Sequence, residues 1–169
     1  MTSLLVQLAK DTIVTYVTTG KTIPPPTELD PELAARAGVF VSIHKNKELR
    51  GCIGTVEPHK TNVAAEIITN AISAATRDPR FSPITSDEVS DLEISVDVLS
   101  APEPVANADS LDPKKYGLIV ECGHRRGLLL PDLPGVANAQ EQIDICRAKG
   151  NIRPNEKVKL YKFEVKRYQ

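Results

Sequence analysis

The sequence has no tryptophan and few other aromatic residues, with 3 phenylalanines and 4 tyrosines among 169 residues. Aromatic side chains supply some of the largest buried areas in most cores, so this core must be built mainly from valine, isoleucine, leucine and alanine. A chain of this length can bury roughly 70% of the surface that its unfolded state exposes. We therefore expect a single domain that spans residues 1–169.

Charge of one sign is not in excess, because 21 lysines and arginines face 22 aspartates and glutamates. This balance argues against a protein that binds nucleic acid mainly through its overall charge. No apolar run approaches the length of a transmembrane helix, and the N-terminus lacks the charged-then-apolar pattern of a secretory signal. The sequence thus predicts a cytoplasmic protein without membrane contact.

Cysteine and histidine are scarce, at three residues each. An odd number of widely spaced cysteines without a Cys-x-x-Cys motif is typical of reduced thiols in the cytosol. No pair of these residues has the spacing of a zinc finger, and the glycine fingerprints of phosphate loops and dinucleotide-binding turns are missing. We therefore predict neither a metal site nor a bound cofactor.

Apolar periodicity divides the chain into helices and strands. The predicted elements, in chain order, are a helix over residues 2–19, a short helical turn over 30–35, a hairpin over 38–55, a helix over 61–76, a strand over 92–99, a second hairpin that starts at 116, a helix over about 138–149 and a strand over about 157–166. Gly20 is placed to end the first helix, and Thr61 is the expected N-cap of the 61–76 helix.

The order hairpin, helix, strand occurs twice, over residues of about 38–100 and 116–167. Arg50-Gly51 in the first hairpin and Arg126-Gly127 in the second take the same place. Internal similarity of this kind indicates two fused copies of one unit. We therefore predict an α+β fold in which an N-terminal helix precedes two hairpin-helix-strand repeats.

The stretch Leu49–Thr55 combines a guanidinium and a thiol two positions apart with two glycines. Arg50 and Cys52 would share one face of a strand, with Gly51 on the other face, and Gly54 lets another group come close to the backbone. One interpretation is an accessible corner with a reactive Cys52. The other is a core strand with a bulge at Gly51, since free cysteine is often buried.

Four further residues are candidates for binding. Asp78 and Arg80 stand in the loop after the second long helix, where they either line a site or form an exposed ion pair of little energetic value. Glu121 and Arg126, the latter within the cluster His124–Arg126, break the similarity between the two repeats. Groups that break such a pseudo-symmetry are better candidates for function than groups that obey it, although side chains at strand ends and turns usually face water.

These residues lie in motifs that occur together in a known family. The motifs are Leu49-Arg-Gly-Cys-Ile-Gly54, Asp78-Pro-Arg-Phe81, Tyr116-Gly-Leu-Ile-Val120 and Gly127-Leu-Leu-Leu-Pro131. Through them the chain resembles the AMMECR-domain family over nearly its whole length. Its second half is most similar to bacterial members called AmmeMemoRadiSam system protein A.

The resemblance implies two β/α repeats that share a curved, barrel-like antiparallel sheet, with a cleft near Arg50, Gly51 and Cys52. Proteins of this family occur fused to or beside two other kinds of protein, Memo-like proteins and radical-SAM proteins. The resemblance therefore implies a role in a pathway that is shared with them. It does not assign catalysis, substrate binding or partner binding to this domain.

Three functions remain open. In the first, the protein is a substrate-binding or partner module in which Arg50 and Arg80 hold a small anion, because the guanidinium fork suits carboxylate and phosphate. In the second, it is an enzyme with Cys52 as nucleophile, and the available bases are His44, His59 and His124.

In the third, nucleic acid binds to the basic segment Arg147–Arg167, where eight lysines and arginines face two glutamates. The apolar alternation of that segment is instead typical of a core strand, and lysines on an edge strand also protect against aggregation. Binding of nucleic acid is the least favoured of the three.

Overall fold

The computed structural model describes residues 1–169, which divide into two compact units. Unit 1 contains residues 1–99 and 166–169, and unit 2 contains residues 100–165. The prediction that the whole chain behaves as one domain stays a prediction. None of the helices combines the length and the hydropathy that crossing a membrane requires.

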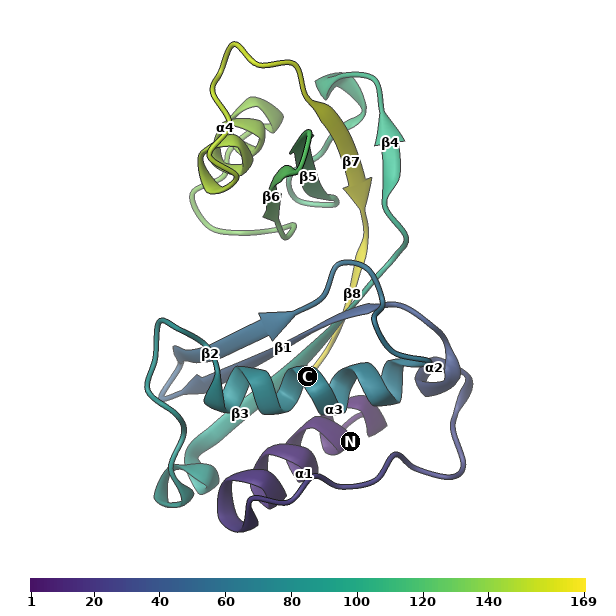
Figure 1. Cartoon of the computed structure of the whole chain (residues 1–169), viewed down its shortest axis with the longest axis vertical. Helices are drawn as coiled ribbons and strands as arrows, with labels where there is room; N and C mark the ends of the chain where they lie inside the picture. The colour runs from purple at the N-terminus through teal and green to yellow at the C-terminus, as the bar shows by residue number, and fades with distance from the viewer. The chain divides into compact units, whose positions relative to one another are not determined.

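Unit 1 contains a sheet with two long helices (Figure 1). Its elements are α1 (Leu4–Thr19), α2 (Pro31–Ala34), β1 (Gly38–Lys45), β2 (Glu48–Gly54), α3 (Val63–Thr76), the 3₁₀-helix η1 (Ser86–Asp91) and β3 (Leu92–Leu99), and the last strand β8 (Val165–Tyr168) joins the same sheet. The strand order is β2-β1-β3-β8, and β1 is antiparallel to both of its neighbours.

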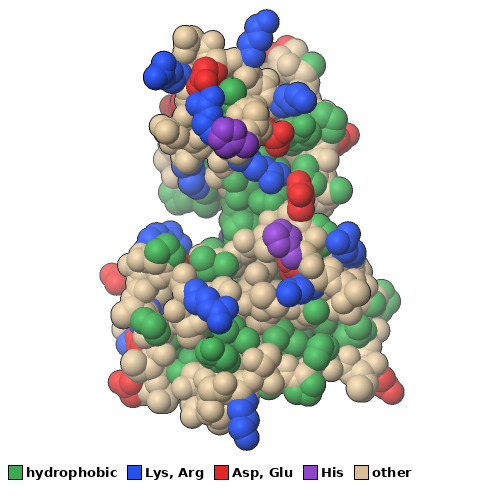
Figure 2. Space-filling view, in the orientation of Figure 1, with side chains coloured by type: hydrophobic (Ala, Val, Ile, Leu, Met, Phe, Trp, Pro, Cys, Tyr) green, Lys and Arg blue, Asp and Glu red, His purple; other side chains and the backbone are tan.

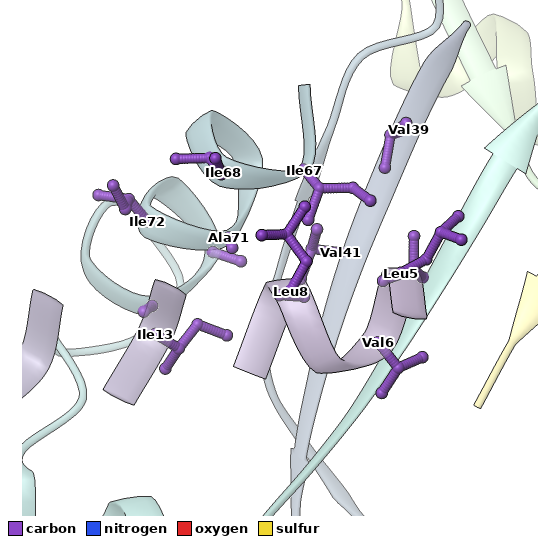
Figure 3. Close-up of a cluster of buried hydrophobic side chains, with 14 of the residues drawn as sticks. Leu5, Val6, Leu8, Ile13, Val39, Val41, Ile67, Ile68, Ala71 and Ile72 are labelled. Atoms are coloured by element: carbon purple, nitrogen blue, oxygen red, sulfur yellow. The ribbon is translucent and has the colours of Figure 1, made fainter. Parts of the chain in front are cut away.

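One face of this sheet forms the core of unit 1. Val39, Val41 and Ile43 of β1 are fully buried beneath α1 and α3. Figure 3 shows Leu5 and Leu8 of α1 and Ile67 of α3 gathered in the same cluster. The intervening residues of β1 point to the other side of the sheet. This core is aliphatic, as the absence of tryptophan requires.

The opposite face of the sheet is polar, and we call it the polar face. Its side chains come from positions that pair across β2, β1 and β3, and they are Cys52, Phe40, Ser42, His44, Glu93, Ser95 and Asp97. Asp97 is buried and accepts two hydrogen bonds from Arg167 of β8, at 2.8 Å each. The alternation of apolar and polar residues that predicts these strands therefore also gives the sheet one core face and one polar face.

The predicted helix boundaries are confirmed with one correction. Ser3 caps α1 by accepting a hydrogen bond from the Val6 amide, and Gly20 ends the helix in the left-handed conformation. The N-cap of α3 is Asn62 and not Thr61, because the Asn62 side chain accepts a hydrogen bond from the Ala65 amide. Thr61 and Asn62 are both good N-cap residues, and asparagine is at least as favourable as threonine. The predicted N-cap is therefore one residue too early.

Unit 2 repeats the arrangement with shorter elements (Figure 1). They are β4 (Glu103–Val105), the 3₁₀-helix η2 (Ala108–Ser110), β5 (Gly117–Cys122), β6 (Arg125–Leu129), α4 (Ala139–Lys149) and β7 (Lys159–Phe163). The strand order is β4-β7-β5-β6. Helix α4 packs Ile143 and Cys146 against Leu118, Val120 and Leu129 of the sheet.

Two details support the duplication that the sequence predicts. A Cβ atom on Gly51 would lie 2.2 Å from the Ala74 carbonyl oxygen of α3, and one on Gly127 would lie 1.7 Å from the Cys146 carbonyl oxygen of α4. Each glycine thus lets a helix pack directly on its hairpin. An asparagine, eleven residues after each glycine, caps the helix that follows.

The prediction of one shared, barrel-like sheet is not confirmed. The strands form two four-stranded sheets, and neither closes into a barrel. In each repeat the strand after the helix pairs with the first strand of the hairpin, as β3 does with β1 and β7 with β5. Each sheet is completed by a strand that follows the other repeat in the chain. β8 pairs with the outer edge of β3, and β4 pairs with the outer edge of β7.

Candidate functional site

A bulge sets the geometry of the Leu49–Gly54 motif. The two-residue turn Asn46-Lys47 pairs His44 with Leu49, but Ile43 pairs with Gly51, so Arg50 is an extra residue in β2. A bulge of this kind re-aims a side chain and bends the strand. The expected bulge is therefore present, one residue before the position that the sequence suggested.

The bulge turns Gly51 and not Arg50 toward the helices. Without it, Arg50 would pair with Ile43 and face the apolar core, because directly paired residues share a face of the sheet. Gly51 is buried against the Ala74 carbonyl instead. The expectation that Arg50 and Cys52 lie away from Gly51 agrees with this arrangement.

Gly54 has a different neighbour. A Cβ atom at this position would lie 2.2 Å from the ring of Phe40, the residue that Gly54 pairs with on β1. The ring therefore lies across the backbone at the end of β2. Gly54 makes room for an aromatic side chain of the polar face.

Arg50 is engaged by the protein itself. Its Nε and Nη2 donate to the two carboxylate oxygens of Glu88 at 3.0 and 3.1 Å, and its Nη1 donates to the Ser82 carbonyl at 2.8 Å. Lys45 also donates to Glu88 at 3.1 Å. Arg50 thus fixes η1 and the preceding loop to β2, and this bonding leaves little of its fork for a ligand.

Asp78 and Arg80 occupy the outer edge of β2. Buried Asp78 accepts the Cys52 N–H at 3.0 Å, and Arg80 Nη2 donates to the Cys52 carbonyl at 3.4 Å. Arg80 also binds Asp78 with Nε at 3.0 Å and with Nη2 at 2.8 Å. The pair acts as a substitute for a neighbouring strand, so it is more than an exposed surface ion pair.

The Arg80 guanidinium is held in place and remains accessible. The Arg80 side chain is 56% exposed, and the guanidinium lies 5.4 Å from the centre of the Phe81 ring. Hydrogen bonds with Arg80 hold the pKa of the Asp78 carboxyl well below its usual range, so Asp78 is ionised at neutral pH. Nη1 is the one terminal nitrogen of Arg80 that makes no hydrogen bond within the protein.

The Cys52 thiol is half-buried on the polar face, 3.2 Å from the Ser42 hydroxyl. Burial raises the pKa of the Cys52 thiol, and the hydrogen bond with Ser42 and the charge of Arg80 offset only part of this effect. None of the three histidines hydrogen-bonds to the thiol. The thiol therefore lacks the two features that activate a cysteine nucleophile, a lowered pKa and an adjacent base.

Cys52 is expected to react slowly with iodoacetamide at pH 7, with an apparent pKa above that of an ordinary free thiol, because burial raises it. Peptide mass spectrometry after alkylation across a pH series measures this value. Half-buried Cys122 and buried Cys146, whose thiol pKa is raised by burial to about 12, are the internal controls. A fast Cys52 reaction with an apparent pKa below 7 would reverse the interpretation and favour a nucleophile.

The remaining predicted residues belong to unit 2. Glu121 and Arg126 pair with each other across β5 and β6, with 3.9 Å between the carboxylate and Arg126 Nε. Their neighbour Arg125 forms an ion pair with Glu156, which lowers the pKa of Glu156 to about 2. The structure thus places Arg50, Gly51, Cys52, Gly54, Asp78 and Arg80 together in unit 1, and Glu121 and Arg126 together in unit 2.

Two residues of the site were not found from the sequence. Glu88 belongs to a capping box at the start of η1, and its bond with Arg50 spans 38 positions. Ser42 was predicted only as a strand residue. The register of the hairpin could have placed Ser42 opposite Cys52. The bulge shifts that register by one residue, so the pairing could not be read from the turn alone.

No group of three or more His, Cys, Asp or Glu side chains is arranged to hold a metal ion. The basic segment Arg147–Arg167 contributes to both sheets through β7 and β8. On the visible face of unit 2, Lys and Arg side chains alternate with Asp and Glu (Figure 2). That face shows no continuous basic track of the kind that nucleic acid needs.

The AMMECR1 family model matches residues 6–169, so the chain belongs to the AMMECR1 family. A protein of Thermotoga maritima is 51% identical over 160 residues, which cover 93% of this chain and 92% of that protein. The crystal structure of an uncharacterised protein from Pyrococcus horikoshii has a TM-score of 0.88 at 35% identity, and the match covers 96% of this chain and 88% of that one.

A protein of Clostridium acetobutylicum is 46% identical over 166 residues. The match covers 97% of this chain but only 35% of the Clostridium protein. A close relative of this chain therefore forms about a third of a longer polypeptide.

Proposed function

We propose that the protein is a binding module that receives an anionic group at Arg80, on a substrate or on a partner protein. Cys52 and Ser42 lie beside this position. The module acts in one pathway with Memo-like and radical-SAM proteins, as the resemblance of its motifs to bacterial AmmeMemoRadiSam proteins implies. The cleft near the Leu49–Gly54 motif is part of this proposal.

One observation carries the proposal: a guanidinium that is fixed on one side and exposed on the other. Nε and Nη2 of Arg80 are fixed by Asp78, whereas Nη1 has no partner in the protein and more than half of the side chain is exposed. A pre-oriented guanidinium loses less rotational freedom when it binds a carboxylate or phosphate than a mobile side chain does. Arg80 is therefore better placed than Arg50 to hold an anion.

The chemistry at Cys52 favours binding over catalysis. A thiol with a raised pKa is mostly protonated at neutral pH, and a protonated thiol is a weak nucleophile but can still donate a weak hydrogen bond. The Ser42 hydroxyl next to it can donate or accept. Together with Arg80 they offer donors to an anion and supply no base.

The longer Clostridium protein supports the idea that the module works beside another domain. The region that matches this chain makes up only 35% of that protein. Covalent fusion raises the effective concentration of two parts that act together. A free module of the same family would need a docking surface to reach its partner. An exposed arginine at a fixed edge strand is suited to such a contact.

A titration with inorganic phosphate at constant ionic strength tests the anion site. We expect saturable NMR shifts of the Arg80 Nε–H and the Cys52 amide in the wild type, and their loss in Arg80→Gln. Arg77→Gln is the matched control, because Arg77 is an exposed arginine at the end of α3. Equal shifts in the wild type and Arg80→Gln, or no saturation, would contradict an anion site at Arg80.

Binding to purified Memo-like and radical-SAM proteins tests the partner function. Charge reversal in Arg80→Glu is expected to weaken binding to at least one of them by tenfold or more, which corresponds to about 1.4 kcal/mol. Arg77→Glu should leave the affinity unchanged. If neither protein binds the wild type with a dissociation constant below about 100 μM, the partner part of the proposal fails while the anion site can still stand.

A further inference from the structure

Unit 2 contains a polar cavity that is lined by Arg125 of the cluster His124–Arg126 and by none of the other candidate residues. Its volume is about 350 Å³, within the range of small-molecule pockets. Three arginines from separate segments line it: Arg125 at the start of β6, Arg147 in the last turn of α4, and Arg153 in the loop that follows. Glu156 is the one acidic residue among its lining residues.

Two of the arginines hold the walls of the cavity. Arg125 binds the Glu156 carboxylate and donates to the Asn151 carbonyl at 3.0 Å. Arg147 Nη1 donates to the carbonyls of Arg153 at 2.6 Å and Glu156 at 3.0 Å. These bonds fix the loop after α4, so the cavity is pre-formed.

The hydrogen bonds of the protein leave positive charge at this cavity. Glu156 forms an ion pair with Arg125 and also interacts electrostatically with Arg153, whereas Arg147 retains Nε and Nη2 without a protein partner. The Arg153 guanidinium makes no hydrogen bond or ion pair within the protein, since only its main-chain groups are bonded. Three guanidinium charges thus face one carboxylate, which leaves an excess of positive charge for a ligand.

Comparison of the repeats shows which of these arginines has a counterpart in unit 1. In unit 1, Arg50 joins the hairpin to the segment after the helix through Glu88 and the Ser82 carbonyl. Arg125 does the same in unit 2 through Glu156 and the Asn151 carbonyl. The carbonyls of Ala74 in unit 1 and Cys146 in unit 2 pack on equivalent glycines, so these two residues correspond. The next residue is the buried Ala75 in unit 1 and Arg147 in unit 2, so Arg147 has no arginine counterpart.

We propose that this cavity is a binding site for a small molecule that carries a phosphate dianion, held by Arg147 and Arg153 with Arg125 at its side. The guanidinium fork matches phosphate oxygens two at a time, and two adjacent forks match a doubly charged group. The site lies in unit 2 and is independent of the proposed function of Arg80. It assigns a role to the Arg153 guanidinium, which no hydrogen bond of the fold uses.

The test uses the full-length protein and two probes, inorganic phosphate and pyrophosphate, at constant ionic strength. We expect saturable NMR shifts of the Arg153 Nε–H and the Asn151 amide, and at least tenfold weaker binding to Arg153→Gln. Arg153 is the variant of choice because its side chain is exposed and makes no hydrogen bond within the protein. Lys114→Gln, at an exposed lysine of unit 2, should bind as the wild type does.

The two anion sites can fail separately, because Arg80→Gln should leave the Arg153 signals unchanged and Arg153→Gln should leave the Cys52 amide unchanged. Wild-type affinity of Arg153→Gln, or shifts that grow without saturation, would overturn the cavity as a phosphate site. Saturable binding of a single-stranded oligonucleotide without any response to phosphate or pyrophosphate would also overturn it, in favour of a nucleic-acid surface.

Discussion

Replacement of Asp78 by alanine is expected to lower the free energy of unfolding by about 2–4 kcal/mol. Asp78 is 4% exposed and accepts hydrogen bonds from the Cys52 amide, the Arg80 amide and the Arg80 guanidinium. Its removal leaves the Cys52 N–H at the edge of β2 without an acceptor and releases the Arg80 side chain. Urea denaturation followed by circular dichroism measures the change.

The same variant links stability to the candidate site. With Asp78→Ala we also expect the anion-dependent shifts of the Cys52 amide to disappear, because Arg80 loses the carboxylate that orients it. Asp91→Ala, at an exposed carboxylate at the end of η1, should change stability by less than about 0.5 kcal/mol. A loss of less than 1 kcal/mol in Asp78→Ala would show that the edge of β2 does not depend on this carboxylate.

Replacement of Glu88 by glutamine is expected to cost about 1–3 kcal/mol, between the values of exposed and buried ion pairs. The Arg50 and Glu88 side chains are 15% and 13% exposed, and Glu88 also accepts a hydrogen bond from Lys45. A double-mutant cycle of Glu88→Gln with Arg50→Gln should show a coupling energy of at least 0.5 kcal/mol. Additive effects in this cycle would mean that the two side chains act independently.

This ion pair also predicts how stability changes with pH. Hydrogen bonds from Arg50 and from the Thr85 amide hold the pKa of the Glu88 carboxyl well below its usual range. A carboxyl with a lowered pKa in the folded state stabilises the fold above its unfolded pKa of about 4.3, and this contribution is lost as the pH falls further. The free energy of unfolding, measured from pH 6 to pH 2, should therefore fall below about pH 4. The fall should be less steep in Glu88→Gln.

An exposed glutamate provides the control for both measurements. Glu48→Gln, at the start of β2, should match the wild type in stability and in pH dependence. If Glu88→Gln loses stability equally at pH 6 and pH 3, the loss comes from packing and not from the charge of Glu88.

Much of the fold could be predicted from the sequence because its signals are local. Helix caps, glycine at the end of α1, apolar alternation in β1 and β3, and the repeated order of elements all act over a few neighbouring residues. The sheet partners could not be predicted this way. β4 and β8 are three and four residues long, and each pairs with a strand of the other repeat, which no local pattern indicates.

The candidate site was found in part. The sequence identified Cys52, Asp78 and Arg80, which the structure joins through hydrogen bonds. It could not show which arginine is available, because the partner of Arg50 lies 38 residues away at Glu88. Sequence spacing reports which groups exist, whereas hydrogen bonds between distant segments decide which of them are already used.

By itself, the sequence determined an aliphatic core, two related repeats and a motif that places an arginine and a thiol around a glycine. The tertiary structure decided the orientation of that motif. Turn Asn46-Lys47 starts a register that would turn Arg50 into the core, and the extra residue in β2 turns Gly51 there instead. The reason is physical: the Ala74 carbonyl of α3 packs where only a glycine leaves room. That packing carries Cys52 to the polar face, opposite Ser42 and beside Arg80.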